Sequence, residues 1–288
     1  MRPLAPACPP LALAVLAGCL LMGATPAAAD VWERSFEVTG VPQVVVGSHD
    51  ASVQVETWDR PGVAFRVVTS GWRIGPGGVS VEASQSGARV ELRVREPAWT
   101  ISFFSIHSVR IEVSTPRRAD LEVDTGDGSV TVGALEGTAR LHTGDGEIRV
   151  TDLKGELWLR SGDGPIAGTG LDGKLVAHTG DGHVRISGRF DRLEVTTGDG
   201  RIELRAEPGS KLDSDWLVRT GDGGVDLSLP RELKANLDAH TGDGGIQLDL
   251  PVQISGRFSR GTVVGALNGG GPPLVLRSGD GGIRIGPS

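Results

Sequence analysis

The chain has 288 residues, with 29 Lys or Arg against 36 Asp or Glu, which gives a formal net charge of −7. This acidic balance argues against a nucleic-acid partner, which needs a basic face to neutralise phosphates, and against simple adsorption to an anionic membrane. The chain is 38% hydrophobic and long enough to bury a core. Its 44 glycines are about twice the usual share, which indicates many tight turns.

Residues 1–29 have the pattern of a secretory signal peptide. Arg2 supplies the positive start, and residues 11–22 form an apolar run that is too short to span a bilayer. Residues 27–29 are three alanines, the small residues after which a signal peptidase cleaves. We therefore expect cleavage before Asp30 and a protein that is exported to the periplasm, the cell surface or the medium.

A second export signal overlaps the first. Residues 16–19 read Leu-Ala-Gly-Cys, which matches a lipoprotein cleavage box. The alternative to a signal peptidase site is therefore a lipid anchor on Cys19, which is also the only basis on which we expect membrane association. Cleavage before Asp30 removes both cysteines, Cys8 and Cys19, and leaves no disulfide. No later apolar run approaches the length of a membrane span.

The tetrapeptide [Ser/Thr]-Gly-Asp-Gly occurs eight times between residues 125 and 281. The first five copies follow one another at a constant interval of about 18 residues, and the later intervals are longer and unequal. A constant period of about 20 residues is typical of repeat architectures. The copies begin at Thr125, Thr143, Ser161, Thr179, Thr197, Thr220, Thr241 and Ser278.

Each repeat contains two short runs in which apolar and polar residues alternate. In the second repeat these runs are centred on Ile148/Val150 and Leu157/Leu159, and Gly155 marks a bend between them. Alternation with period 2 predicts strands with one buried face. One repeat, or rung, therefore consists of a turn, a short strand, a bend and a second short strand.

A single rung cannot bury its apolar face, but stacked rungs bury it in continuous columns. We therefore predict an all-β fold, a parallel β-solenoid (a single-stranded β-helix) with rungs of about 18 residues. Parallel crossovers are nearly always right-handed, so we expect that hand. We also expect the glycines of each Gly-Asp-Gly turn to adopt positive φ, as tight corners often require.

The prediction divides the mature chain into two regions. Residues 125–288 form the solenoid, and residues 30–124 form an N-terminal β region with degenerate repeats that caps it. Residues 48–55 support this, because Ser-His-Asp-Ala followed by alternating valines aligns with the turn and the strand after it. Residues 206–211 and 230–234 are expected to be loop insertions that leave the core columns intact.

Two segments are open to two interpretations. Residues 251–273 are either a degenerate rung or an excursion from the stack. Residues 99–104, which read Trp-Thr-Ile-Ser-Phe-Phe, either pack over the open end of the first rung or form an exposed aromatic contact loop.

Two stretches carry a resemblance to a known family. Residues 53–60 form one, and residues 265–285 form the other, with Asn-Gly-Gly-Gly-Pro-Pro-Leu at 268–274 followed by a final Gly-Asp turn. They resemble the bacterial β-strand-repeat family of unknown function whose members are described as adhesins. The resemblance covers essentially all of the mature chain. It implies a β-solenoid on the envelope or outside the cell, and it supplies no catalytic residues.

One Asp lies in every turn, so stacking places eight carboxylates in a column with a spacing of about 4.8 Å. Carboxylates at that spacing repel each other by about 1 kcal/mol per pair in water, so the column needs solvent, hydrogen-bond donors or cations. The first interpretation is structural, with each Asp accepting hydrogen bonds from backbone N–H groups of its turn. The alternative is weak Ca²⁺ binding, which we disfavour because known Ca²⁺-binding rolls carry such turns on both edges. The weak metal candidates are Asp127, Asp145, Asp163, Asp181, Asp199, Asp222, Asp243 and Asp280.

The residue just before each turn is mostly basic, as at His142, Arg160 and His178. The simplest interpretation is charge compensation of the neighbouring aspartates. A shared metal ion is disfavoured because His142 and His178 are two rungs, roughly 10 Å, apart. No cofactor is expected.

One outward-facing row is less polar than a solvated strand requires. Its apolar members alternate with charged residues, and they are either scattered surface residues or a contact stripe for a partner, with Trp158 at its centre. These candidate contact residues are Trp158, Val176, Leu217 and Val275.

The acidic residues are spread uniformly over the rungs, and such an arrangement singles out no catalytic site. We therefore expect an exported, non-enzymatic interaction or adhesion module whose partner is an envelope protein or a polysaccharide. The alternatives are a carbohydrate-active β-helix enzyme and a weak Ca²⁺-binding repeat protein.

Overall fold

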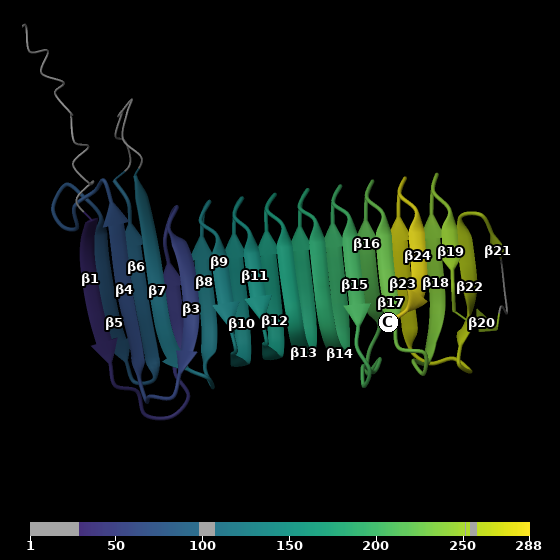
Figure 1. The fold of residues 1–288 in the computed structure, drawn as a ribbon, viewed down its shortest axis with the longest axis horizontal. Coiled ribbons are helices and arrows are strands. Elements are labelled where there is room, and N and C mark those ends of the chain that lie inside the picture. Colours follow the sequence, from purple (N-terminus) through teal and green to yellow (C-terminus); the bar gives the residue numbers. More distant parts are fainter. Residues whose placement is uncertain (1–28, 98–106, 251, 254–257) are drawn as a thin grey trace, which may run out of the picture.

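The computed structural model describes residues 29–97, 107–250, 252–253 and 258–288. In this part of the chain 24 strands join in one mixed, mostly parallel sheet, and no helix is present. Figure 1 shows the result as a long rack of strands. The all-β prediction is confirmed. The predicted signal peptide up to residue 28 and the aromatic segment at 99–104 lie outside the described residues.

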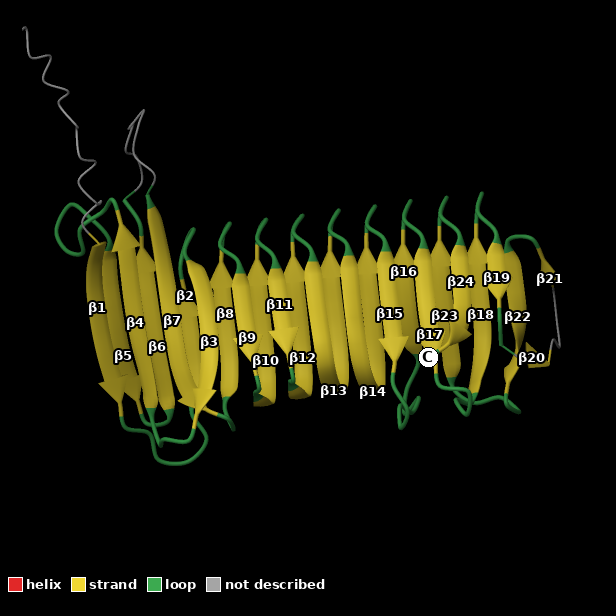
Figure 2. Cartoon of the chain, in the orientation of Figure 1, coloured by secondary structure: helices red, strands yellow, loops and turns green. Residues whose placement is uncertain are grey.

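The central rungs follow the predicted order of turn, strand, bend and strand. In Figure 2 the ascending strands run into the turns along one long edge of the rack, and the descending strands leave those turns. The ascending strands are β8 (Asp120–Thr125), β10 (Glu136–Thr143), β12 (Lys154–Ser161), β16 (Trp216–Thr220), β18 (Ala235–Thr241) and β23 (Pro273–Ser278). The descending strands are β9 (Val130–Gly133), β11 (Ile148–Thr151), β15 (Ile202–Ala206), β17 (Val225–Leu229), β19 (Ile246–Leu248) and β24 (Ile283–Pro287). Two strands run unbroken through the bend and serve in both sets, β13 (Ile166–Thr179) and β14 (Val184–Thr197).

The strand register confirms the predicted period. Ile148 of β11 pairs in parallel with Val130 on one side and with Ile166 on the other, a shift of one repeat each time. The two predicted insertions, between β15 and β16 and between β17 and β18, are loops on the edge opposite the turns (Figure 1). Beyond the first insertion the register resumes, with Glu194 paired to Leu217.

The first rung of the chain does not lie at the end of the stack. The turn predicted at residues 48–51 joins β2 (Gln43–Gly47) to β3 (Ser52–Trp58), and Val53 pairs with Val130 as the alignment predicts. However, β2 and β3 also pair on their other side with β6 (Arg89–Arg95) and β7 (Ser108–Pro116), which come later in the sequence. Antiparallel strands extend this end of the stack: β1 (Ala29–Phe36), β4 (Val63–Ser70) and β5 (Ser80–Ser86).

The last rung is also placed one position inward. Strands β23 and β24 lie between the rung of β16 and β17 and the rung of β18 and β19, and they pair in parallel with both. Figure 1 shows these yellow strands between greener ones, with the C-terminus well inside the rack. The preceding segment is an excursion and not a rung, because β22 (Thr262–Leu267) runs antiparallel to β18. Two short strands pair with β22: β20 (Val252–Gln253) and β21 (Phe258–Ser259).

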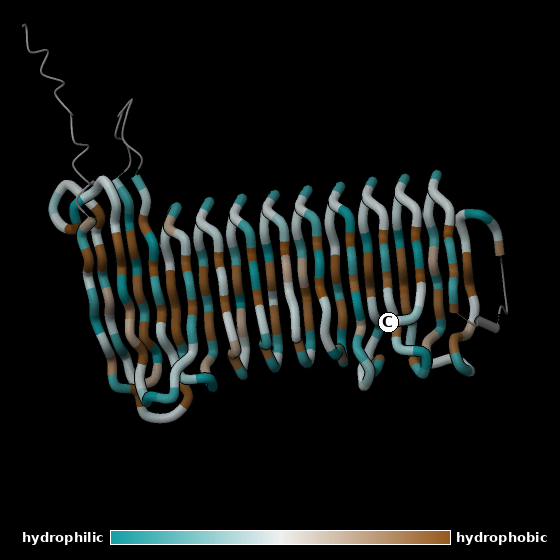
Figure 3. Tube along the Cα trace, in the orientation of Figure 1, coloured by the Kyte–Doolittle hydropathy of each residue, from teal (hydrophilic) through white to brown (hydrophobic). Residues whose placement is uncertain are grey.

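The core is a continuous set of columns inside the stack. Side chains alternate between buried and exposed along the strands. Figure 3 shows the corresponding alternation of hydrophobic and hydrophilic residues along the chain trace. Ile148, Leu157 and Leu159 are almost completely buried, as predicted, and the buried apolar residues form one cluster along the rack. Each such side chain contributes about 1.5–3 kcal/mol relative to exposure. Trp216 packs edge to face against Phe190, where their ring centroids lie 6.3 Å apart.

Glycine has two different roles in a rung. The bend glycine Gly155 has φ +130°, and Gly137 and Gly173 repeat this conformation. The prediction of positive φ in the Gly-Asp-Gly turns is wrong, because none of these turn glycines has positive φ. They are needed for another reason: a Cβ on Gly146 would lie 2.1 Å from the carbonyl oxygen of Gly128 in the rung below. Close approach of successive turns therefore excludes any side chain.

The register predicts the effect of removing one rung. Deleting residues 143–160 joins His142 to Ser161, and every remaining core position keeps its neighbours because the deletion removes one whole period of the register. We expect a folded protein that melts cooperatively, since repeats interact mainly with their nearest neighbours. Deleting only residues 143–151 should unfold the stack. Circular dichroism and thermal melting test both, and equal melting of the two deletions would contradict the register.

Candidate functional site

The turn edge is built on a column of buried hydroxyl groups. The Thr143 hydroxyl donates to the carbonyl oxygens of Gly126 and Gly128 in the rung below, at 2.9 Å each. It also accepts a hydrogen bond from the N–H of Gly146 in its own turn. The same contacts recur through the stack, so the Ser or Thr of the motif holds each turn to its neighbour. In spatial order this hydroxyl column consists of Thr125, Thr143, Ser161, Thr179, Thr197, Thr220, Ser278 and Thr241.

The aspartates follow the hydroxyl column on the outside. All eight predicted side chains are exposed, and the register places them one rung apart. Asp280 lies between Asp222 and Asp243, because Ser278 pairs with both Thr220 and Thr241. Asp50 of the degenerate first turn extends the column beyond Asp127, since His49 accepts the hydrogen bonds that a turn glycine accepts elsewhere.

The interactions of the aspartates differ from the structural interpretation. Among the described residues these carboxylates accept no hydrogen bond from backbone N–H groups, and the turn N–H of Gly146 is bound by the Thr143 hydroxyl. The described residues also contain no group of three acidic, His or Cys side chains with the spacing of a metal site. The column is thus a solvated row of single carboxylates.

The residues before the turns form a second row on the ascending strands, which we call the basic row. Its spatial order differs from its sequence order, because Arg277 lies between Arg219 and His240. Within the described residues the basic row makes no ion pair with the aspartate column. Arg277 instead pairs with Asp238, with Nη2 2.6 Å from Oδ2. In spatial order the basic row reads His142, Arg160, His178, Thr196, Arg219, Arg277 and His240.

The four predicted contact residues lie in one row, two positions before the basic row in each strand. Trp158 pairs with Val176, and Leu217 pairs with Val275. Glu194 separates the two pairs. All four side chains are half-buried on the outer face of the ascending strands.

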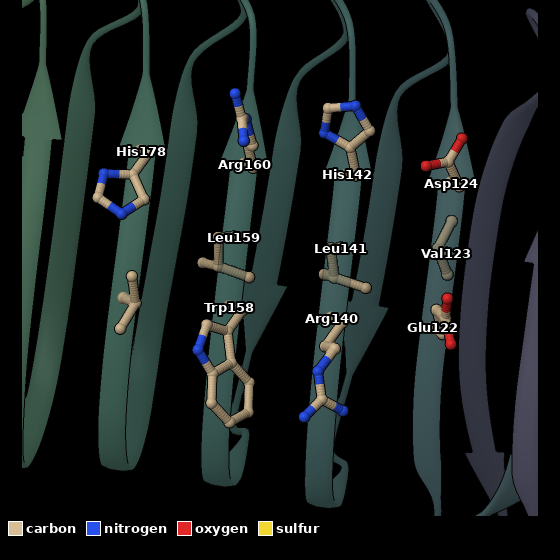
Figure 4. Close-up of a pocket in the computed structure, with 11 residues that line it drawn as sticks. Glu122, Val123, Asp124, Arg140, Leu141, His142, Trp158, Leu159, Arg160 and His178 are labelled. Atoms are coloured by element: carbon tan, nitrogen blue, oxygen red, sulfur yellow. The ribbon is translucent and has the colours of Figure 1, made fainter.

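A shallow hollow of about 370 Å³ surrounds Trp158. Figure 4 shows Trp158 beneath Arg160, with Arg140 on the next strand and His142 and His178 on either side of Arg160. The Arg140 guanidinium carbon lies over the indole ring, 4.5 Å from its centroid. A cation at this distance from an aromatic face is attracted by the ring quadrupole. We call the surface formed by Trp158, Arg140, Arg160, His142 and His178 the tryptophan face.

The two arginines of the tryptophan face differ from Arg149 and Arg185 on the descending strands. Among the described residues no carboxylate lies within 4.0 Å of the Arg140 or Arg160 guanidinium groups. On the descending layer, by contrast, Arg185 Nε lies 2.7 Å from Glu203 Oε2. This hydrogen bond lowers the pKa of Glu203, against the smaller effect of its partial burial. Arg149 is similarly paired with Glu147.

The sequence placed Arg140 in the same outward row as Trp158, but it did not predict the contact between the two side chains. The signal was available, because residues one period apart in regular rungs are neighbours: Arg140 lies one period before Trp158, and Glu122 lies one period before Arg140. The side-chain direction was not available. Arg140 turns toward the indole ring and makes no ion pair with Glu122.

The model of the family Toastrack DUF4097 matches residues 45–285, which confirms the resemblance predicted from the two quoted stretches. No curated protein matches the chain.

Three crystal structures of bacterial proteins are similar to the chain. A proposed lipid-binding protein from Parabacteroides distasonis is 13% identical, with a TM-score of 0.42, over 89% of this chain and 96% of that one. A proposed adhesin from Bacteroides fragilis is 9% identical, with a TM-score of 0.36, over 90% and 97%. A proposed cell adhesion protein from Clostridium sporogenes is 11% identical, with a TM-score of 0.30, over 91% and 100%.

The turn geometry predicts opposite results for two neighbouring residues. Thr143→Val removes the hydroxyl and leaves two buried carbonyl oxygens and one N–H without this partner, which should cost about 1–3 kcal/mol. Asp145→Asn removes one exposed charge from the row of carboxylates and should change stability by less than about 1 kcal/mol. Thermal melting of the purified variants measures both.

The chain offers its own control, since Ser161 and Ser278 occupy the same column. Thr143→Ser should therefore retain most of the stability that Thr143→Val loses. A fall of the melting temperature by more than about 10 °C in a chelator would show instead that bound cations hold the aspartate column together.

Proposed function

Since the chain belongs to the Toastrack DUF4097 family, we propose that it is an exported, non-enzymatic interaction or adhesion module of the cell envelope. In this proposal the stack is a parallel, right-handed β-solenoid, the hand that parallel crossovers prefer. The observation that carries the proposal is the half-buried apolar row on the outer face, set on strands whose neighbours hold it in register.

The display of side chains supports binding. Parallel pairing with the rung on each side keeps an outward row straight, so a partner meets side chains in fixed positions. Preorganised contacts spare a complex the entropy of ordering loops. Trp158, partly exposed at the centre of the tryptophan face, is the kind of residue that dominates binding energy at interfaces.

A non-enzymatic role follows from the uniformity of the acidic residues. Each aspartate of the column occupies the same exposed position in its turn, next to the same hydroxyl. General acid–base chemistry needs groups whose surroundings push their proton affinities apart. A repeated, solvated carboxylate offers no such difference.

The proposed location follows from residues 1–29. Cleavage before Asp30 would release the chain into the periplasm, onto the cell surface or into the medium, and acylation of Cys19 would anchor it to a membrane leaflet. No helix in the described part of the chain has the length and hydropathy to cross a membrane.

Export is tested by the mass of the mature protein. Expressed in its native host, the chain should yield an intact mass that corresponds to residues 30–288, because cleavage follows the three alanines. A mass that starts at Cys19 and includes acyl chains would overturn this cleavage site and establish the lipid anchor. A Cys19→Ser variant is the control, and its mass should differ from the wild type only in the second case.

Binding is tested with envelope fractions from the native host. The mature chain should bind the polysaccharide or the protein fraction saturably and leave its partner chemically intact, because the proposal includes no turnover. Ultracentrifugation measures binding, and reducing-end and peptide assays measure turnover. Release of sugar or peptide fragments that a side-chain substitution abolishes would contradict the non-enzymatic role.

A further inference from the structure

We infer that the tryptophan face binds an acidic polysaccharide, with Arg160 and Arg140 contacting its carboxylates and Trp158 contacting the apolar side of a sugar ring. This inference rests on the proposed function and names the partner class of the same surface.

The first support is charge. The chain as a whole is acidic, yet the seven rungs from His142 to His240 place no carboxylate in this row. Its charged members are Arg160, Arg219 and Arg277, of which Arg277 pairs with Asp238. The row itself begins with a carboxylate, because Asp124 precedes the first turn and pairs with His142 in the strand register, and Asp124 and Glu122 border the hollow at this end. A concentration of positive charge on an acidic protein selects an anionic ligand and repels it from the rest of the surface.

The second support is the state of the cations. The guanidinium groups of Arg140 and Arg160 have no carboxylate within 4.0 Å among the described residues, whereas Arg149 and Arg185 are neutralised by neighbouring glutamates. An arginine without an internal carboxylate partner keeps its planar N–H donors available for the carboxylate of a ligand, which it binds in bidentate geometry. On the tryptophan face the carboxylate that pairs with each arginine would then come from the ligand.

The third support is the aromatic ring. Trp158 is half-buried beside Val176, and its indole N–H has no hydrogen-bond partner among the described residues. Indole combines a large apolar surface with one donor, which suits a ligand that has both C–H and O–H groups. A sugar ring has such a surface, and an inorganic anion does not.

The fourth support is repetition along the stack. Three rungs beyond Trp158, roughly 14 Å away, Leu217 and Val275 form a second apolar pair below Arg219. Two similar positions in series on one straight row suit a linear polymer with repeated acidic groups. An anionic membrane is less suitable, because its broad surface would also meet the aspartate column.

The experiment uses mature protein and three carboxylated polysaccharides, namely polygalacturonate, alginate and hyaluronate, with dextran as the neutral control. Calorimetric titration should show binding to at least one acidic polymer and none to dextran. Arg160→Gln and Trp158→Ala should each weaken it by about tenfold or more. Arg149→Gln is the matched control, because it removes the same charge from the descending layer and should change affinity by less than about twofold.

Several outcomes would overturn the inference. One is that the protein binds none of the three acidic polymers. Another is that Arg160→Gln and Arg149→Gln lose the same amount of affinity for the polymer. A third is that the protein binds vesicles of anionic phospholipid more tightly than it binds the polymers. If the protein binds dextran sulfate and Trp158→Ala does not weaken that binding, the binding is a general polyanion effect. If envelope fractions bind the wild type and both tryptophan-face variants equally, the proposed function stands and this assignment fails; if nothing binds the wild type, both fail. All variants must melt like the wild type.

Discussion

The hydrogen bond from a buried Ser or Thr hydroxyl to the turn below is the interaction on which the stack depends. It requires the turns to lie so close together that a Cβ on Gly146 would clash with the carbonyl oxygen of Gly128. The motif is therefore one physical unit: the hydroxyl supplies the bond, the flanking glycines permit the distance, and the Asp between them stays in solvent. A hydroxyl deprived of its partners would leave polar groups buried in an apolar stack, which is costly.

The outer surface follows from this spacing. Because each rung repeats the path of the one below, side chains on the same face form straight rows. The charge and polarity of a row depend on the one residue that each rung contributes to it. On the descending side Arg185 pairs with Glu203, and Arg149 pairs with Glu147. On the ascending strands Arg140 binds an aromatic ring, and Arg160 has no acidic partner within the described residues. The two faces have the same backbone and differ in what their side chains leave unsatisfied.

Local features of the fold could be predicted from sequence, and nonlocal ones could not. The alternation of apolar and polar residues around Ile148 and the constant interval between turns were sufficient to predict the strands, the core columns and the register of the regular rungs. The position of β23 and β24 between two earlier rungs left no periodic signal in the sequence. The turn that begins at Ser278 has the same motif as the other turns and would fit the hydroxyl column at any rung. The sign of φ in the turns was missed because glycine serves both conformational freedom and close approach. At the tryptophan face the outward row that contains Trp158 was predictable. The direction of the Arg140 side chain was not, because the Trp158 ring and the Glu122 carboxylate compete for its guanidinium group.

The inward placement of the first and last rungs constrains how the chain assembles. A chain that emerges from a ribosome or an export channel presents β2 and β3 early, directly after β1, but their neighbours β6 and β7 appear only after β4 and β5 have followed. At the other end, the slot between β17 and β19 is filled by the final residues of the chain. Only the middle rungs can therefore form in the order of synthesis, and each end closes after the chain has doubled back. The C-terminal strands β23 and β24 are thereby paired on two sides, so that unravelling from this end must first break a two-sided sheet.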